Sequence, residues 1–338
     1  MGQASLPAVS RSRLECLPAE IIQEIFLHSL EFNFPRVSRY IAGILSNTVI
    51  YTWLIRLAFS SANEGSKRGL FTPDFLPAPL DFWALSTEER RDLQTDILAC
   101  GWCTLPLIQK CQRQYVEQVI RRQMQDLEFC ADDLPALAEM GRRFESLEGY
   151  EKDERLHGKG DMVLKAHDRT TEKEARVAVW FHHGTVQILQ PSRLYTRHDI
   201  FQLPDCSAVC PPRMPDKLLC PPWTESKLEF LHLLSTTAYI DEDSSLSRSK
   251  RVLRQLIRDR DLATFERLMQ MQVMAQDYKY PQRWPVPTII FRAALKYADE
   301  RDDPFVRVLV NHCWEDIPGD DLQLRDQLMT KAGLNSVG

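Results

Sequence analysis

The sequence lacks any uninterrupted apolar run long enough to cross a membrane. Its most apolar stretch, residues 40–59, is broken by Ser46, Asn47, Thr48 and Arg56, whereas a spanning helix needs about 18 or more consecutive apolar residues. The first residues are also not followed by the apolar core of a secretory signal. We therefore expect a protein without a membrane segment and without a signal peptide.

Neither positively nor negatively charged residues are in large excess. The chain has 42 lysines and arginines against 47 aspartates and glutamates, which gives a net charge of −5. The basic residues are scattered among acidic ones, as on an ordinary solvated surface, and do not form the basic stretch that usually marks a nucleic-acid-binding face. The composition therefore predicts no nucleic-acid partner.

The cysteines do not form a disulfide pattern. There are nine, an odd number, at irregular spacing in 338 residues of which 44% are hydrophobic. Such a chain can build a core without disulfides, and scattered cysteines are typical of free thiols in a reducing compartment. We expect an intracellular protein, cytoplasmic, nuclear or both.

Common catalytic signatures are absent as well. The sequence contains no Gly-x-Ser-x-Gly, His-Glu-x-x-His or kinase motif. We therefore expect a protein that is not an enzyme, with no cofactor and no metal. A weaker hypothesis is a zinc- or thiol-dependent enzyme built on Cys100, Cys103, Cys206 and Cys210. A separate candidate zinc site would draw its ligands from Cys206, Cys210, Cys220, His182, His183 and His198.

The pair Cys100 and Cys103 is the strongest part of that set, because Cys-x-x-Cys can be a redox centre or half of a zinc site. A redox pair needs a strand before it and a helix that begins at the first cysteine. Here a helix is expected to end near Ala99 and another to begin after Thr104. The sequence favours a helix junction in which Trp102 anchors the packing.

Four segments differ in residue pattern. Residues 12–60 are dense in Ile, Leu and Val at helical spacing, and residues 61–150 continue into amphipathic helices. Residues 151–224 are charged and proline-rich, with a β-hairpin expected near 176–189. Residues 225–338 are again helical, with a weak repeat that suggests helix pairs of the ankyrin type. The predicted fold class is therefore mainly α, with one small hairpin.

Local signals place several helices. Pro18 suits the start of a helix, and Asn47 can cap another through its side-chain oxygen. Ser86 and Glu89 have the spacing of a capping box. The first helix is expected to carry one apolar stripe made of Ile21, Ile22, Ile25, Phe26 and Leu30.

Residues 12–60 contain a series of short motifs in this order: Leu17-Pro18-Ala19-Glu20-Ile21, Ile25-Phe26, Val37-Ser38-Arg39, Leu45-Ser46, Ile50-Tyr51 and Leu54. With this order of motifs the segment resembles an F-box. The remainder is similar to fungal F-box-like proteins in two short stretches, Leu80-Asp81-Phe82-Trp83 and Trp102-Cys103-Thr104-Leu105-Pro106.

The resemblance implies a binding role. F-boxes dock on the small adaptor subunit of SCF-type cullin-RING ubiquitin ligases, and the attached domain binds a target protein. By matched position, the adaptor would meet Leu17, Pro18, Ile21, Ile25, Val37, Ile41 and Tyr51. The alternative is a helical protein-interaction scaffold unrelated to ubiquitin, in which these helices are ordinary core. Exposure of the apolar residues distinguishes the two hypotheses.

Overall fold

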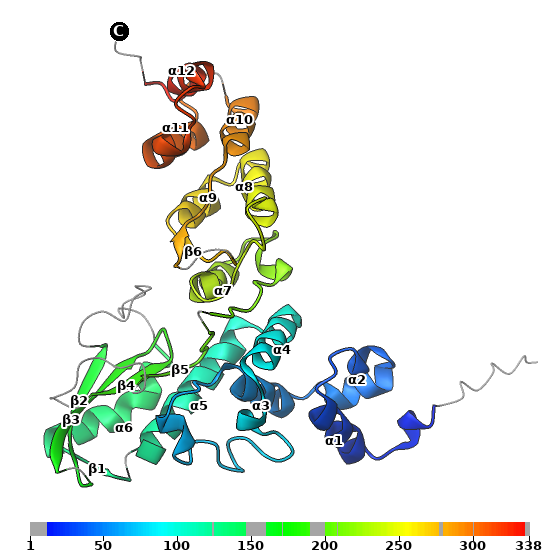
Figure 1. Cartoon of the computed structure of the whole chain (residues 1–338), viewed down its shortest axis with the longest axis vertical. Helices are drawn as coiled ribbons and strands as arrows, with labels where there is room; N and C mark the ends of the chain where they lie inside the picture. The colour runs from blue at the N-terminus through cyan, green and yellow to red at the C-terminus, as the bar shows by residue number, and fades with distance from the viewer. Residues whose placement is uncertain are drawn as a thin grey trace, which may run out of the picture. The chain divides into compact units, whose positions relative to one another are not determined.

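A computed structural model gives the fold of most of the chain. The residues that it describes are 12–123, 125–146, 160–170, 172–189, 200–207, 209–276, 280–299 and 301–334. Within them the chain forms twelve α-helices, a five-stranded sheet and a two-stranded sheet (Figure 1). The chain divides into two compact units, Met1–Asp205 and Cys206–Gly338, and each is described by itself.

The first unit begins with three short helices, α1 (Ala19–Ser29), α2 (Arg39–Leu45) and α3 (Thr48–Phe59). The predicted cap at Asn47 is confirmed, because its Oδ1 accepts a hydrogen bond from the Val49 amide at 2.8 Å. Pro35 lies in a separate 3-10 turn, and α2 begins after Ser38, whose hydroxyl accepts a hydrogen bond from the Ile41 amide.

Helices α4 (Thr87–Ala99) and α5 (Leu105–Gln123) pack against α3. The predicted capping box at the start of α4 is confirmed: the Ser86 hydroxyl accepts from the Glu89 amide, and the Glu89 carboxylate accepts from the Ser86 amide. The buried Gln94 of α4 donates to the carbonyl of Ala58 at 2.8 Å. A polar side chain is therefore satisfied inside this helical core.

An antiparallel sheet completes the first unit, with its five strands in chain order. They are β1 (Leu127–Phe129), β2 (Met162–Asp168), β3 (Lys173–Trp180), β4 (Thr185–Leu189) and β5 (Ile200–Gln202). Strand β3 is central, since Val177 pairs with Leu164 on one side and with Ile188 on the other. Helix α5 contacts β4 and β5, and helix α6 (Leu134–Arg143) is also part of this unit.

The prediction of a mainly α chain with one small hairpin is wrong, because the described residues form a mixed α/β fold. The expected hairpin is present as β3 and β4, but three further strands flank it. Strand β2 alternates cleanly, with Met162, Leu164 and Ala166 buried and the residues between them exposed. A lone hairpin is marginal in water, and the additional strands let both of its edges form hydrogen bonds.

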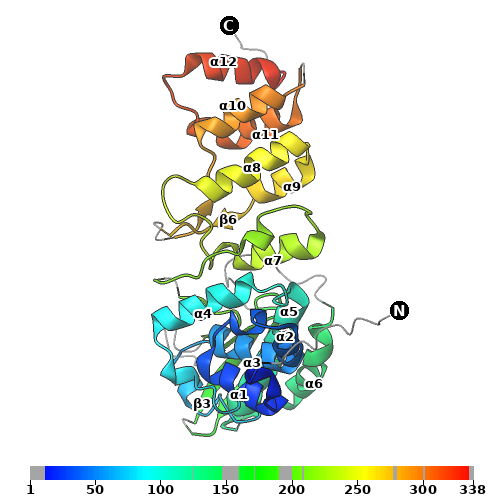
Figure 2. The same ribbon diagram turned by 90° about the vertical axis from the view of Figure 1, so that its right-hand side faces the viewer.

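The second unit is built mainly from six helices. They are α7 (Glu225–Ser235), α8 (Ser247–Asp259), α9 (Leu262–Met269), α10 (Thr288–Tyr297), α11 (Pro304–Cys313) and α12 (Leu322–Lys331). Two short strands, β6 (Gln272–Val273) and β7 (Gln282–Arg283), pair between α9 and α10. Helices α8 and α9 form one layer, and α10 and α11 form the next, followed by α12 (Figure 2). Helices α9, α11 and α12 each begin at an aspartate cap.

No single helix in the described ranges is long and apolar enough to cross a membrane. Helices α2 and α3 together have the length and apolar composition of a spanning segment, but the two helices meet at a bend of 70°.

Candidate protein-docking site

Helix α1 has two apolar faces rather than the single stripe expected from the sequence. Ile22 is 0% exposed and Phe26 is 3% exposed, whereas Ile21 and Ile25 are 40% and 37% exposed. Residues four apart lie one above the other on a helix, so each pair forms its own short row. One row packs inside the first unit. The other remains open to solvent.

Further exposed apolar side chains lie in the same segment. Val37, which immediately precedes the cap of α2, is 65% exposed, and Tyr40 in the first turn of α2 is also exposed. Leu14 and Val49 are exposed as well. Sequence reasoning did not assign a role to Leu14, Tyr40 or Val49. The helical spacing of a sequence shows which residues share a face of the helix. It does not show which face the rest of the protein leaves exposed to solvent.

The remaining predicted docking residues are less accessible. Ile41 is fully buried, so its side chain belongs to the core beneath α2. Leu17 is half-buried, and the exposed Pro18 is the N-cap of α1. The Pro18 carbonyl accepts a hydrogen bond from the Ile22 amide at 3.2 Å, so this proline also starts the helix.

Tyr51 is half-buried, and its ring is occupied within the chain. It stacks on Trp102, with the ring centroids 4.2 Å apart and the planes at 1°. Trp102 lies in the connection between α4 and α5, at the junction where an anchoring role was expected. One face of Tyr51 is therefore held against the body of the first unit.

None of the nine cysteines forms a disulfide bond in the described parts of the chain. Cys103 and Cys111 are buried, and burial raises the pKa of Cys111 to about 11. Within the described ranges, no three His, Cys, Asp or Glu side chains are grouped as a metal site would require. One member of the zinc hypothesis, His198, lies outside those ranges.

Comparison with known proteins identifies no relative. No protein-family model matches the chain, and no curated protein or solved structure is significantly similar to it.

Proposed function

We propose that this protein is a substrate-receptor subunit of a cullin-RING ubiquitin ligase. In this proposal, the open row of α1 and the nearby Val37 dock on the ligase adaptor. The observation that carries it is the exposure of Ile21 and Ile25 in a segment whose sequence resembles an F-box. The chain itself contributes binding and no chemistry.

The physical support is the cost of leaving large aliphatic side chains in water. Burying an isoleucine side chain completely stabilises a complex by about 1.5–3 kcal/mol. Ile21 and Ile25 are already partly covered, so sealing each one would contribute on the order of 1 kcal/mol. A row of such side chains on one helix face is typical of a helix that packs against a partner protein.

The exposures separate five of the seven predicted docking residues into two groups. Ile21, Ile25 and Val37 are accessible enough to touch a partner directly. The buried Ile41 would support the surface from beneath, and Tyr51 would hold it against Trp102. The proposal therefore concentrates the binding energy in α1 and the start of α2.

A binding assay with the purified full chain and purified ligase adaptor tests this role. We expect a dissociation constant in the micromolar range or tighter, about −8 kcal/mol. Ile25→Asp should weaken binding by about 100-fold or more, because an unpaired carboxylate buried in the interface costs several kcal/mol. The exposed position of Ile25 should leave the fold intact, which circular dichroism would verify.

Leu322→Asp is the matched control. Leu322 is a 71% exposed apolar residue at the start of α12 in the second unit, where a negative charge suits the helix dipole. It should bind the adaptor as the unmodified chain does. Absence of adaptor binding by the unmodified chain would reject the receptor role and favour the alternative, a protein-interaction scaffold unrelated to ubiquitin.

A further inference from the structure

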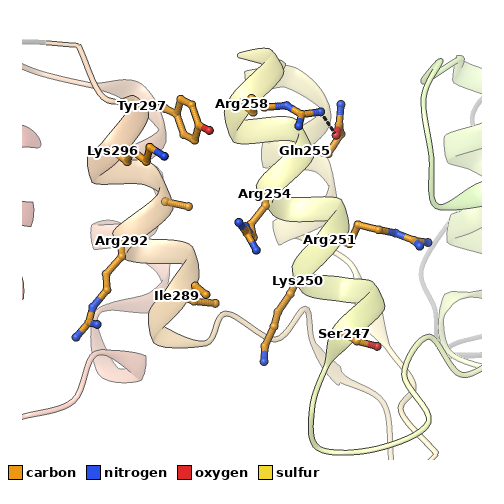
Figure 3. Close-up of a pocket in the computed structure, with 11 residues that line it drawn as sticks. Ser247, Lys250, Arg251, Arg254, Gln255, Arg258, Ile289, Arg292, Lys296 and Tyr297 are labelled. Atoms are coloured by element: carbon orange, nitrogen blue, oxygen red, sulfur yellow. Dashed lines mark hydrogen bonds between the residues drawn. The ribbon is translucent and has the colours of Figure 1, made fainter.

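A groove between α8 and α10 of the second unit is lined by six cationic side chains. Its volume is about 490 Å³, and Figure 3 shows its lining residues along the two helices. The cations are Lys250, Arg251, Arg254, Arg258, Arg292 and Lys296. A net charge of −5 for the whole chain makes this local concentration of positive charge notable.

Helical spacing accounts for the cluster. Along α8, Lys250, Arg254 and Arg258 recur at intervals of four, which places them on one side of the helix. The opposite side of α8, including Val252 and Leu256, is buried. Helix α10 repeats the arrangement with Arg292 and Lys296 four residues apart and Ile290, Phe291 and Ala294 buried behind them. Contact between α8 and α10 then brings the two cationic rows together.

Half of these cations are already paired. Arg251 forms an ion pair with Asp216 at 3.2 Å, and Arg292 forms one with Asp321 at 3.1 Å. Arg258 lies 3.5 Å from the neighbouring Asp259.

The other three, Lys250, Arg254 and Lys296, have no carboxylate within 4.0 Å among the residues that the structure describes. Arg254 and Lys296 are exposed, and Lys250 is half-buried. The charge of Lys250 helps to lower the pKa of Asp243. Among the described residues, Arg254 and Lys296 therefore contribute the positive charge of the groove that has no carboxylate at ion-pair distance.

The size and the borders of the groove favour a short ligand. Lys250 and Arg258 are eight positions apart, which spans about 12 Å along a helix and matches about four residues of extended peptide. Asp259 and Asp321 stand beside the cations at its edges. A long phosphodiester backbone would meet these carboxylates as it left the groove, whereas a short peptide would not.

The lining is not purely cationic. Ile289 is 46% exposed and Tyr297 is 40% exposed, and both contribute to the groove together with Ala293. In Figure 3 Ile289 and Tyr297 extend from α10 toward α8. Such a surface can accept an apolar side chain next to charged ones, a combination that a peptide offers and a bare phosphate chain does not.

We propose that the groove between α8 and α10 binds a short peptide segment rich in aspartate and glutamate, supplied by a partner protein. The carboxylates of that segment would pair with Lys250, Arg254 and Lys296, and an apolar side chain would contact Ile289 and Tyr297. Identifying the partner as the ubiquitylation target rests on the proposed function, whereas binding of the acidic segment does not.

Fluorescence anisotropy with the purified full chain tests the groove. The probe is a fluorescein-labelled peptide of about four aspartate, glutamate and leucine residues, the length expected to fill the groove. We expect saturable binding that weakens as salt increases, because these exposed charges are screened. Arg254→Gln/Lys296→Gln should weaken binding by about tenfold, since two exposed charge pairs are lost. Glutamine is a good helix former, so both helices should remain folded.

The matched control is Arg301→Gln/Arg307→Gln, which removes the same charge from exposed positions of the second unit outside the groove. It should change the dissociation constant by less than about twofold, within the range expected for distant surface charges. Equal weakening by both double variants would mean that only net charge matters, and the proposal would be wrong. Absence of peptide binding by the unmodified chain would also reject it.

Two competing ligands identify the anion. Tighter binding of a single-stranded oligothymidine, or binding of a phosphoserine peptide with no binding of the carboxylate peptide, would overturn the proposal. Ile25→Asp separates the two functions, because it should weaken adaptor binding by about 100-fold or more and leave the acidic peptide bound. If the unmodified chain binds the acidic peptide but not the adaptor, the receptor role is rejected and the groove proposal stands.

Discussion

The guanidinium of Arg260 lies 2.8 Å from the carboxylate of Asp303, which is fully buried. Asp303 also caps α11 by accepting from the Val306 amide at 3.1 Å, and it accepts from the Asp299 amide. The Arg260 guanidinium lies 4.8 Å from the centre of the Phe305 ring. One ion pair therefore joins the turn between α8 and α9 to the start of α11, and it fixes two successive helix layers.

Asp303→Asn should destabilise the second unit. The amide keeps one acceptor oxygen but loses the charge that holds Arg260, and hydrogen bonds to charged groups contribute about 1.5–3 kcal/mol. We expect the free energy of unfolding to fall by about that amount in urea titrations. Asp302→Asn is the control, because Asp302 is exposed and, among the described residues, forms its ion pair with the exposed Arg307. A control variant as unstable as Asp303→Asn would contradict this account.

Two adjacent isoleucines of α1 should behave differently. Ile22 is fully buried and Ile21 is 40% exposed. Ile22→Ala should lower the free energy of unfolding by about 2–4 kcal/mol, through lost transfer energy and a cavity. Ile21→Ala should cost less than about 1 kcal/mol and should weaken adaptor binding instead. Thermal melting and the binding assay measure the two effects. Similar melting temperatures for the two variants would show that the faces of α1 are assigned incorrectly.

Gly184, in the turn between β3 and β4, should not tolerate a side chain. Its φ is +55°, and an added Cβ would lie 2.5 Å from Gln112 Cγ and 2.6 Å from the Leu203 carbonyl oxygen. Gly69 has a φ of +72° with nothing within 4 Å of an added Cβ.

Gly69→Ala should therefore cost about 1–2 kcal/mol, from the left-handed backbone alone. Gly184→Ala should cost more than about 3 kcal/mol, because a steric clash is added to that strain. Urea unfolding of the two variants measures the difference. Equal losses would mean that the turn can move away from Gln112.

Cys111 should resist alkylation in the native protein. Burial raises its pKa to about 11, which outweighs the opposing effect of the nearby Arg56. At pH 8 only about one molecule in a thousand would carry the reactive thiolate. Exposed cysteines such as Cys16 and Cys220 should react with iodoacetamide first, as peptide mass spectrometry would show.

The raised pKa of Cys111 also determines how protein stability depends on pH. The folded-state pKa of Cys111 lies above the usual thiol value, so the folded state favours the neutral thiol. The stability that this provides is present below the unfolded pKa and is lost as the pH rises through about 11. Rapid modification of Cys111 at pH 8 without unfolding would contradict this prediction.

Signals confined to a few neighbouring residues were predictable. The cap at Asn47 and the capping box of Ser86 and Glu89 depend on residues two or three positions away, and the structure confirms both. The hairpin around Gly184 was also visible, because its two strands are adjacent in sequence.

The rest of the sheet was not predicted. Strands β1 and β5 have three residues each, too few for a recognisable pattern, and β1 pairs with a strand about forty positions away, with Leu127 opposite Asp168. Strand β2 did carry a signal in its alternation of buried and exposed residues, but the segment 151–224 was described only as charged and proline-rich with one hairpin.

The sequence by itself determined that α1 is a helix and that Ile21, Ile22, Ile25 and Phe26 lie along it, because helical spacing is a local property. Only the tertiary structure decided that Ile22 and Phe26 pack inward while Ile21 and Ile25 stay exposed. It also decided that cations scattered through an acidic chain meet in one groove. The physical reason is the same in both cases: burial and charge density depend on which distant segments pack together, and no local spacing specifies that.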